Sequence, residues 1–245
     1  MSTAPRRPSS PRKRGRLVVA DGADFVRRVA AWLVDGIRRT CAARDVCRVA
    51  LAGGETPRPV YAALAGPHAK PIPWDRVEVF FTDERAVPPT DPHSNFSMVR
   101  ETLLAHVPIP ASQVHRMEGE RADLAAAARD YDALLPARLD VLLLGMGPDG
   151  HTASLFPGDA SLAERERRVM PVVVTKAPSR RLTITPPVMA VARRVAVLAT
   201  GSEKADAAVR ALEGPYNPME VPVQLGLAGT WFLDRAAAAR LTGPT

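Results

Sequence analysis

The sequence predicts an α/β fold in which a mostly parallel β-sheet is covered by helices. Short continuous apolar runs, typical of strands buried on both faces, alternate with longer stretches whose apolar residues recur at helical spacing. No internal repeat and no long linker divides the chain, and 245 residues that are 46% hydrophobic can form one sizeable core. We therefore expect a single domain over residues 17–245.

The strands are predicted from their apolar runs. They are expected from Val18 onward and at 46–51, 77–81, 139–144, 169–174, 182–184, 195–198 and 230–233. The run at 139–144 is the most apolar of these. We therefore expect it near the centre of the sheet, where neighbouring strands and helices bury it on both faces.

The helices are predicted from amphipathic spacing and from capping residues. Asp21 or Asp24 can cap the first helix, whose apolar face extends to Ile37. Further helices are expected at 60–64, 97–106, 122–135, from 186 onward, at 201–212 and in the Ala/Arg-rich C-terminal segment.

The net charge of +7 is concentrated at the N-terminus. Residues 1–16 contain six basic residues and no acid, which leaves a net charge of +1 for residues 17–245. This Pro/Ser/Arg segment lacks the apolar residues needed to fold and the aromatic residues of single-strand binders, so we expect a disordered basic tail. No apolar run approaches the roughly 20 residues that cross a bilayer. The expectation is a cytoplasmic protein with no nucleic-acid or membrane partner.

Neither a metal site nor a cofactor is predicted. Cys41 and Cys47 form no CxxC pair and have no histidine nearby, so they are expected to be buried thiols. The five histidines show no HxxxH spacing. The glycines at 145, 147 and 150 do not follow the GxGxxG order of a dinucleotide-binding loop.

Segments of unusual chemistry follow several predicted strands. In an open parallel sheet, ligands bind outside the carboxyl ends of the strands, so these segments should meet at one site. The first contains Gly53 and Gly54, which let the backbone approach an anion, then Thr56 and a helix start whose free N–H groups favour phosphate. Ordinary turn chemistry is the alternative interpretation of this segment.

The second segment places Asp83, Glu84 and Arg85 directly after an apolar strand. Charges at the end of a central strand lie in a partly desolvated crevice, where pKa values are often perturbed. A solvated loop is the alternative, and Ser94, which follows, can simply cap the next helix.

The third segment contains Asp149 and His151 among three glycines, after the most apolar strand. The glycines allow a tight backbone that presents N–H donors, and Asp149 can hold one ring nitrogen of the histidine. His151 is expected at a helix start, with Ser154 three residues inside that helix. A lone histidine is more often structural, but the acid and the glycines beside this one favour a catalytic role.

Arg181 and Lys204 are the candidate ligands for a phosphate. An arginine fork and a lysine near a helix N-terminus suit a phosphate dianion. Taken alone, either residue would be interpreted as an ordinary charged residue of the surface.

Taken together, these segments resemble the 6-phosphogluconolactonase family, within the group that includes glucosamine-6-phosphate deaminases. The resemblance is carried by 53–57, 82–88 with 94–95, and 145–158, and is supported by 181–183 and 201–205. The family implies a Rossmann-like sheet with helices on both faces, no cofactor, and a phosphosugar lactone as substrate.

The resemblance also implies a role for each matching residue. His151 corresponds to the catalytic base, with Asp83, Arg85 and Asp149 as its neighbours. The implied phosphate contacts are Gly53, Gly54, Thr56, Arg181 and Lys204. Whether Arg180 or Arg181 meets the phosphate stays open.

A δ-lactone is an ester, so its hydrolysis needs an activated water, a stabilised oxyanion and a proton for the leaving ring oxygen. One histidine can make both proton transfers, because the unperturbed pKa of an imidazole is about 6.5. The expected reaction is hydrolysis of 6-phospho-D-glucono-1,5-lactone to 6-phosphogluconate in the pentose phosphate pathway, by a monomer. A covalent route through Ser154 is disfavoured, because the GxSxG elbow is missing.

Two other functions are weighed against this one. Glucosamine-6-phosphate deaminases usually have Asp-Glu-Tyr where this chain has Asp83-Glu84-Arg85, which favours the lactonase. A sugar-phosphate-sensing transcription regulator would need a DNA-binding module of about 60 residues or more, and a 16-residue tail cannot form a helix-turn-helix.

Overall fold

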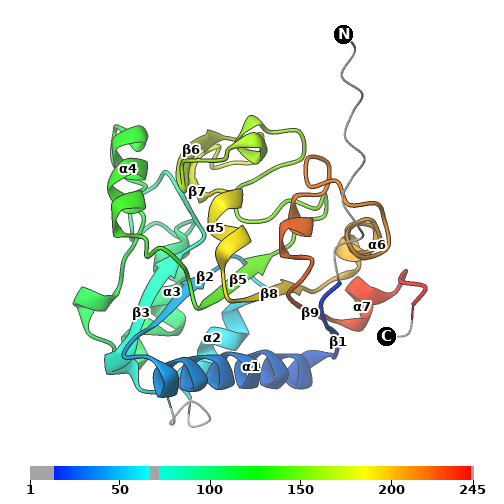
Figure 1. Cartoon of the computed structure of the whole chain (residues 1–245), viewed down its shortest axis with the longest axis horizontal. Coiled ribbons are helices and arrows are strands. Elements are labelled where there is room, and N and C mark those ends of the chain that lie inside the picture. The colour runs from blue at the N-terminus through cyan, green and yellow to red at the C-terminus, as the bar shows by residue number, and fades with distance from the viewer. Residues whose placement is uncertain (1–13, 67–71, 244–245) are drawn as a thin grey trace.

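Six of the predicted apolar runs pair into one fully parallel sheet (Figure 1). The computed structural model describes residues 14–66 and 72–243 of the chain. In spatial order the strands of this sheet are β1 (Leu17–Val19), β9 (Thr230–Leu233), β8 (Arg194–Ala199), β5 (Val141–Gly145), β2 (Cys47–Leu51) and β3 (Val77–Phe81). The most apolar run, β5, is one of the two central strands, as expected.

Helices cover both faces of the parallel sheet, which confirms the predicted fold class. Along β5, Leu142 and Leu144 belong to one hydrophobic cluster, whereas Val141 and Leu143 belong to the other, because successive strand residues face opposite sides. The first cluster includes residues of α4 (Leu124–Leu134), α5 (Pro186–Val191), α6 (Ala205–Leu212) and α7 (Arg235–Ala238). The second includes residues of α1 (Gly22–Ala43), α2 (Arg58–Ala65) and α3 (Asn95–Thr102).

Three strands form a second, antiparallel sheet, in the order β4-β7-β6. They are β4 (Asp83–Arg85), β7 (Arg180–Ile184) and β6 (Val169–Val173). The alternative interpretation of 83–85 as a solvated loop is therefore wrong, and the runs at 169–174 and 182–184 do not extend the main sheet. A short apolar run indicates a strand but not its partner, which is decided by contacts between segments far apart in sequence.

The expected helix after β5 is absent from residues 146–159. The residues that follow His151 instead form a tight loop, in which Gly147 N–H donates to His151 O and Thr152 Oγ1 donates to Gly145 O. These local hydrogen bonds compete with helical ones. Ser154 therefore lies in a loop rather than inside a helix.

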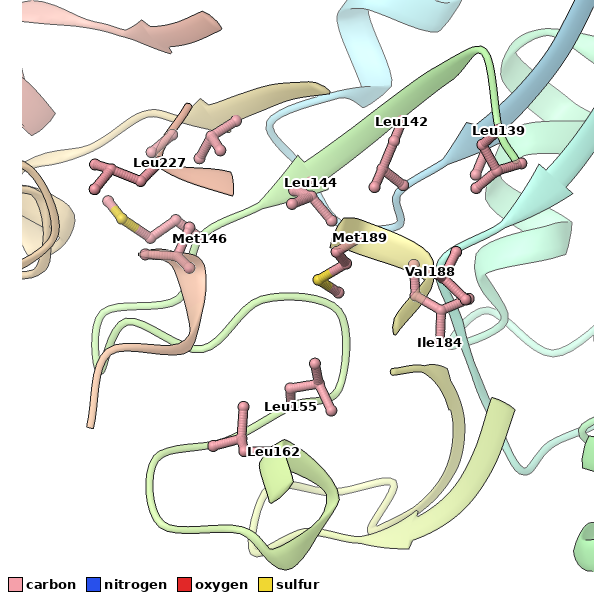
Figure 2. Close-up of a cluster of buried hydrophobic side chains, with 14 of the residues drawn as sticks. Leu139, Leu142, Leu144, Met146, Leu155, Leu162, Ile184, Val188, Met189 and Leu227 are labelled. Atoms are coloured by element: carbon pink, nitrogen blue, oxygen red, sulfur yellow. The ribbon is translucent and has the colours of Figure 1, made fainter. Parts of the chain in front are cut away.

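Apolar residues anchor this loop in the core. Figure 2 shows Leu155 and Leu162 in the same cluster as Leu142 and Leu144 of β5 and Met189 of α5. Leu155 has no exposed surface. The segment that carries His151 is thus held between β5 and a buried side chain four residues farther along.

Two details at the N-terminus differ from the expectations. Gly15 N–H donates to Leu227 O, and Arg16 O accepts from Trp231 N, so these residues of the expected tail pack beside β9. Residues 1–13 lie outside the described part. Asp21 occupies the N-cap position of α1, but its side chain accepts from Arg235 N instead of capping the helix.

The remaining sequence predictions concern caps, thiols and membrane spans. Ser94 does cap α3, because its side chain accepts from Ser97 N. Cys41 and Cys47 are buried free thiols, and burial raises the pKa of Cys47 to about 12. Within residues 14–66 and 72–243, no helix combines the length and apolar composition that crossing a bilayer requires.

Candidate active site

A cleft of about 480 Å³ opens where four neighbouring strands of the main sheet end. Its walls come from the segments that follow β2, β3, β5 and β8, together with residues from around β7. Eight of the nine candidate residues line it, namely Gly53, Gly54, Thr56, Asp83, Arg85, His151, Arg181 and Lys204. The ninth, Asp149, is bonded to His151.

The glycine loop after β2 is shaped by its neighbours. A Cβ atom on Gly53 would lie 1.8 Å from Asn95 Oδ1, so a larger residue would push the loop away from α3. Gly54 has φ = +96°, a conformation that glycine adopts without strain. Thr56 Oγ1 lies 2.8 Å from Thr200 Oγ1, which joins this loop to the one after β8.

The alternation of β4 separates its charged side chains. Asp83 and Arg85 line the cleft, whereas Glu84 does not. The carboxylate of Glu84 instead accepts from Ser94 Oγ and from the backbone N–H groups of Asn95 and Phe96 at the start of α3. Burial raises the pKa of Glu84, although these hydrogen bonds oppose the shift. Glu84 is therefore a structural residue that fixes β4 to α3.

Asp83 is buried and accepts hydrogen bonds from neutral side chains, the longest being from Thr82 Oγ1 at 3.4 Å. Its Oδ2 accepts from Ser154 Oγ at 2.7 Å, and its Oδ1 accepts from Asn95 Nδ2 at 3.1 Å. Asp83 and His151 line the same cleft, but no hydrogen bond joins their side chains in the described part of the chain. The resemblance implies that Asp83 is a neighbour of His151. In the structure the two residues share the cleft but are not bonded to each other.

His151 and Asp149 form a close pair. His151 Nδ1 lies 2.6 Å from Asp149 Oδ1, which also accepts from the backbone N–H of His151 at 3.0 Å. Burial opposes ionisation of Asp149, but the hydrogen bonds from His151 outweigh it and hold the pKa of Asp149 at about 2. No described residue makes a hydrogen bond to Nε2 of His151, and the imidazole lines the cleft.

The structure distinguishes between the two adjacent arginines. Arg181 is 3% exposed and lines the cleft, whereas Arg180 is exposed and directs Nη2 toward Ala122 O. Arg181 Nε and Nη2 donate to Pro178 O and Lys176 O. Burial lowers the pKa of Arg181, an effect that the nearby carboxylate of Asp83 opposes.

Other polar residues of the cleft have no role in the sequence-based prediction. Lys176 and Thr200 line it, and Glu203 lies there with its Oε1 3.8 Å from Lys204 Nζ. Thr200 directly follows the buried strand β8, a signal that could have indicated it. Lys176 lies in a Pro/Ser loop with no distinctive pattern.

Across the described ranges, no three His, Cys, Asp or Glu side chains are grouped so that they could hold a metal ion.

Comparison with known proteins identifies the family. Residues 20–230 match the family model described as glucosamine-6-phosphate isomerases/6-phosphogluconolactonase. The chain belongs to this family. A 6-phosphogluconolactonase from Mycobacterium tuberculosis is 39% identical over 226 residues, which cover 85% of this chain and 91% of the relative. Family membership therefore extends over nearly all of the packed chain.

Solved structures of the family share this architecture. The 6-phosphogluconolactonase from Trypanosoma brucei superposes with a TM-score of 0.82 at 29% identity, covering 93% of this chain and 99% of that one. A monomeric glucosamine-6-phosphate deaminase gives a TM-score of 0.81 at 22% identity, covering 91% and 99%. At that identity the second likeness shows the fold alone, so the fold does not separate the two activities of the family.

Proposed function

We propose that this protein is a 6-phosphogluconolactonase that hydrolyses 6-phospho-D-glucono-1,5-lactone to 6-phosphogluconate in the oxidative pentose phosphate pathway. The observation that carries the proposal is the His151–Asp149 pair, which directs an imidazole into a cleft that also holds Arg181 and Lys204. The names of the relatives agree with this substrate.

His151 acts as the general base in the proposed reaction. Because the pKa of Asp149 is about 2, its carboxylate is ionised at neutral pH and accepts the proton of Nδ1, which leaves the lone pair on Nε2. Nε2 removes a proton from water while the water oxygen attacks the lactone carbonyl carbon. The tetrahedral intermediate then breaks its bond to the ring oxygen, which takes the proton back from Nε2.

The oxyanion of the intermediate needs donors in the same cleft. Arg85 lines it, and its guanidinium supplies positive charge and N–H donors there. The backbone N–H groups of the glycine-rich loop after β5 are the alternative donors. Removing one oxyanion donor from an enzyme typically costs about 3–4 kcal/mol of transition-state stabilisation.

In this proposal the phosphate is bound by the loops after β2 and β8 together with Arg181 of β7. Gly53 and Gly54 offer backbone N–H groups, Thr56 a hydroxyl, and Arg181 and Lys204 positive charge. Charge-assisted hydrogen bonds of this kind are about twice as strong as neutral ones. Binding at the phosphate places the lactone end of the substrate toward His151.

The test is a rate measurement with three substrates. We expect hydrolysis of the phosphorylated lactone well above an enzyme-free control, much slower hydrolysis of gluconolactone without phosphate, and no ammonia release from glucosamine 6-phosphate. Spontaneous lactone hydrolysis requires that every rate be taken as a difference from the control. Ammonia release without lactone hydrolysis would assign the protein to the deaminases.

A further inference from the structure

Phe156 lies between two groups of the candidate active site. Its ring stacks on the imidazole of His151, with centroids 4.2 Å apart and planes inclined by 19°. The guanidinium carbon of Arg181 lies 5.7 Å from the centroid of the same ring. Neither the charge pattern nor the spacing of the sequence pointed to this residue.

We infer that Phe156 is a positioning residue, which fixes the imidazole of His151 and sets its place relative to Arg181. The inference rests on the proposed function, in which His151 is the base and Arg181 binds the phosphate. Phe156 itself has no atom that could transfer a proton, so any effect on catalysis must pass through these two neighbours.

The imidazole is held from several directions. Asp149 bonds Nδ1, and a Cβ atom on Gly147 would lie 2.0 Å from Nδ1, so the ring packs closely against the Gly147 backbone. These two contacts restrain the ring on its Nδ1 side but leave it free to tilt toward its open face. The stacked ring of Phe156 removes this freedom and keeps Nε2 pointing into the cleft, since stacked aromatic rings prefer a defined geometry.

The chain directly before Phe156 is anchored in the fold. Phe156 follows Leu155, which is fully buried in the cluster of Figure 2, and Ser154, whose hydroxyl is bonded to Asp83. A cation within about 6 Å of an aromatic ring centroid is attracted to its face. One ring on an anchored segment therefore contacts both the base and the cation of the phosphate site, and catalysis is sensitive to such placement.

The first test is the substitution Phe156→Leu, which keeps an apolar side chain but removes the planar ring. We expect kcat to fall about tenfold, the change that corresponds to the upper range for one aromatic pair. KM for the phosphorylated lactone should change less than kcat. Phe156→Tyr should restore most of the rate. Phe25→Leu, at a buried position of α1 that does not line the cleft, is the matched control and should keep the wild-type kcat.

The second test asks whether the effect passes through His151. In a His151→Asn background, adding Phe156→Leu should cause little further loss, because the ring that Phe156 positions is already gone. A full additional tenfold loss there, or a wild-type kcat in the single variant, would overturn the inference. If the leucine variant does not fold, Phe156→Met provides a flexible side chain of similar size for the same comparison.

A third measurement needs no activity. Protons of an imidazole stacked on a benzene ring are shifted upfield in the NMR spectrum, so the His151 ring protons should move downfield in Phe156→Leu and stay in place in Phe25→Leu. Unchanged His151 signals in the leucine variant would contradict the inference. A wild-type enzyme that showed the upfield signals but no lactonase activity would instead contradict the proposed function.

Discussion

At the scale of single residues, the cleft is built from side chains that hold one another across long stretches of sequence. Ser154 and Asp83 are bonded although they lie 71 positions apart, and Thr56 and Thr200 although they lie 144 apart. His151 and Asp149, in contrast, lie two positions apart in the chain. The sequence could therefore pair this histidine with its acid, but it could not show what holds Asp83.

The first prediction concerns the base. His151→Asn should keep the fold, because asparagine is smaller and can still face Asp149, and it should reduce turnover about 100- to 10,000-fold, the usual contribution of positioned proton transfer. KM should change little. Rates measured against an enzyme-free control, with a thermal melt to confirm folding, provide the test.

The same variant should lose the pH dependence of the base. Wild-type turnover should rise with pH, since only the neutral ring accepts a proton from water. This rise should be missing in His151→Asn. A folded variant with near wild-type turnover would remove His151 from the mechanism, and Asp83 would be the next candidate, because Glu84 does not line the cleft.

The second prediction uses the adjacent arginines as a matched pair. Arg181→Ala should reduce kcat/KM for the phosphorylated lactone by about 2–4 kcal/mol in transition-state free energy, and much less for gluconolactone. Arg180→Ala should leave both nearly unchanged, because Arg180 is exposed and outside the cleft. If Arg181→Ala reduced kcat/KM equally for the two substrates, phosphate binding would not be the role of Arg181. Its hydrogen bonds to the 176–178 loop would then explain the loss.

At the scale of elements, the short strand β4 decides which charges face the cleft. Its period of two directs Asp83 and Arg85 to one side and Glu84 to the other. The sequence analysis placed these charges in a crevice after a strand, with a solvated loop as the alternative, and did not predict a further strand. Pairing with β7 supplies hydrogen-bond partners for the backbone of β4. The backbone N–H groups at the N-terminus of α3 donate to the carboxylate of Glu84.

The third prediction follows from this role of Glu84. Glu84→Gln places an amide donor against the backbone N–H groups of Asn95 and Phe96, so at least one buried donor loses its acceptor. We expect a loss of about 1–3 kcal/mol in the free energy of unfolding, measured with urea. Glu101→Gln, at an exposed position of the same helix, should change it by no more than about 0.5 kcal/mol. Equal stabilities of the two variants would contradict the structural role.

At the scale of the whole molecule, the charge and the packed core belong to different parts of the chain. Residues 1–16 supply six of the seven net positive charges, whereas the family match covers residues 20–230. The packing of Gly15 and Arg16 beside β9 places the boundary earlier than residue 17. A truncation that tests the tail should therefore end at residue 13.

The fourth prediction is that removing residues 1–13 leaves turnover and melting temperature unchanged. The segment carries four basic residues and no acid, so any salt-sensitive binding to polyanions should weaken with its removal. Heparin chromatography at two salt concentrations, beside the lactone assay, separates the two effects. Lost turnover in a folded truncated protein would show that the segment contributes to catalysis.

The sequence by itself determined the α/β class, the central place of β5, the family, and the meeting of the glycine loop, His151, Arg181 and Lys204 in one cleft. The fold class and the place of β5 follow from apolar periodicity, and the meeting of the loops follows from the strand-end rule, both of which are properties of local segments. The family and the role of Arg181 follow from the resemblance of the motifs. Tertiary structure alone decided the second sheet, the loop in place of a helix after His151, and the contacts of Glu84 and Phe156. These depend on which distant segments pack together, and the free energy of that packing outweighs local preference.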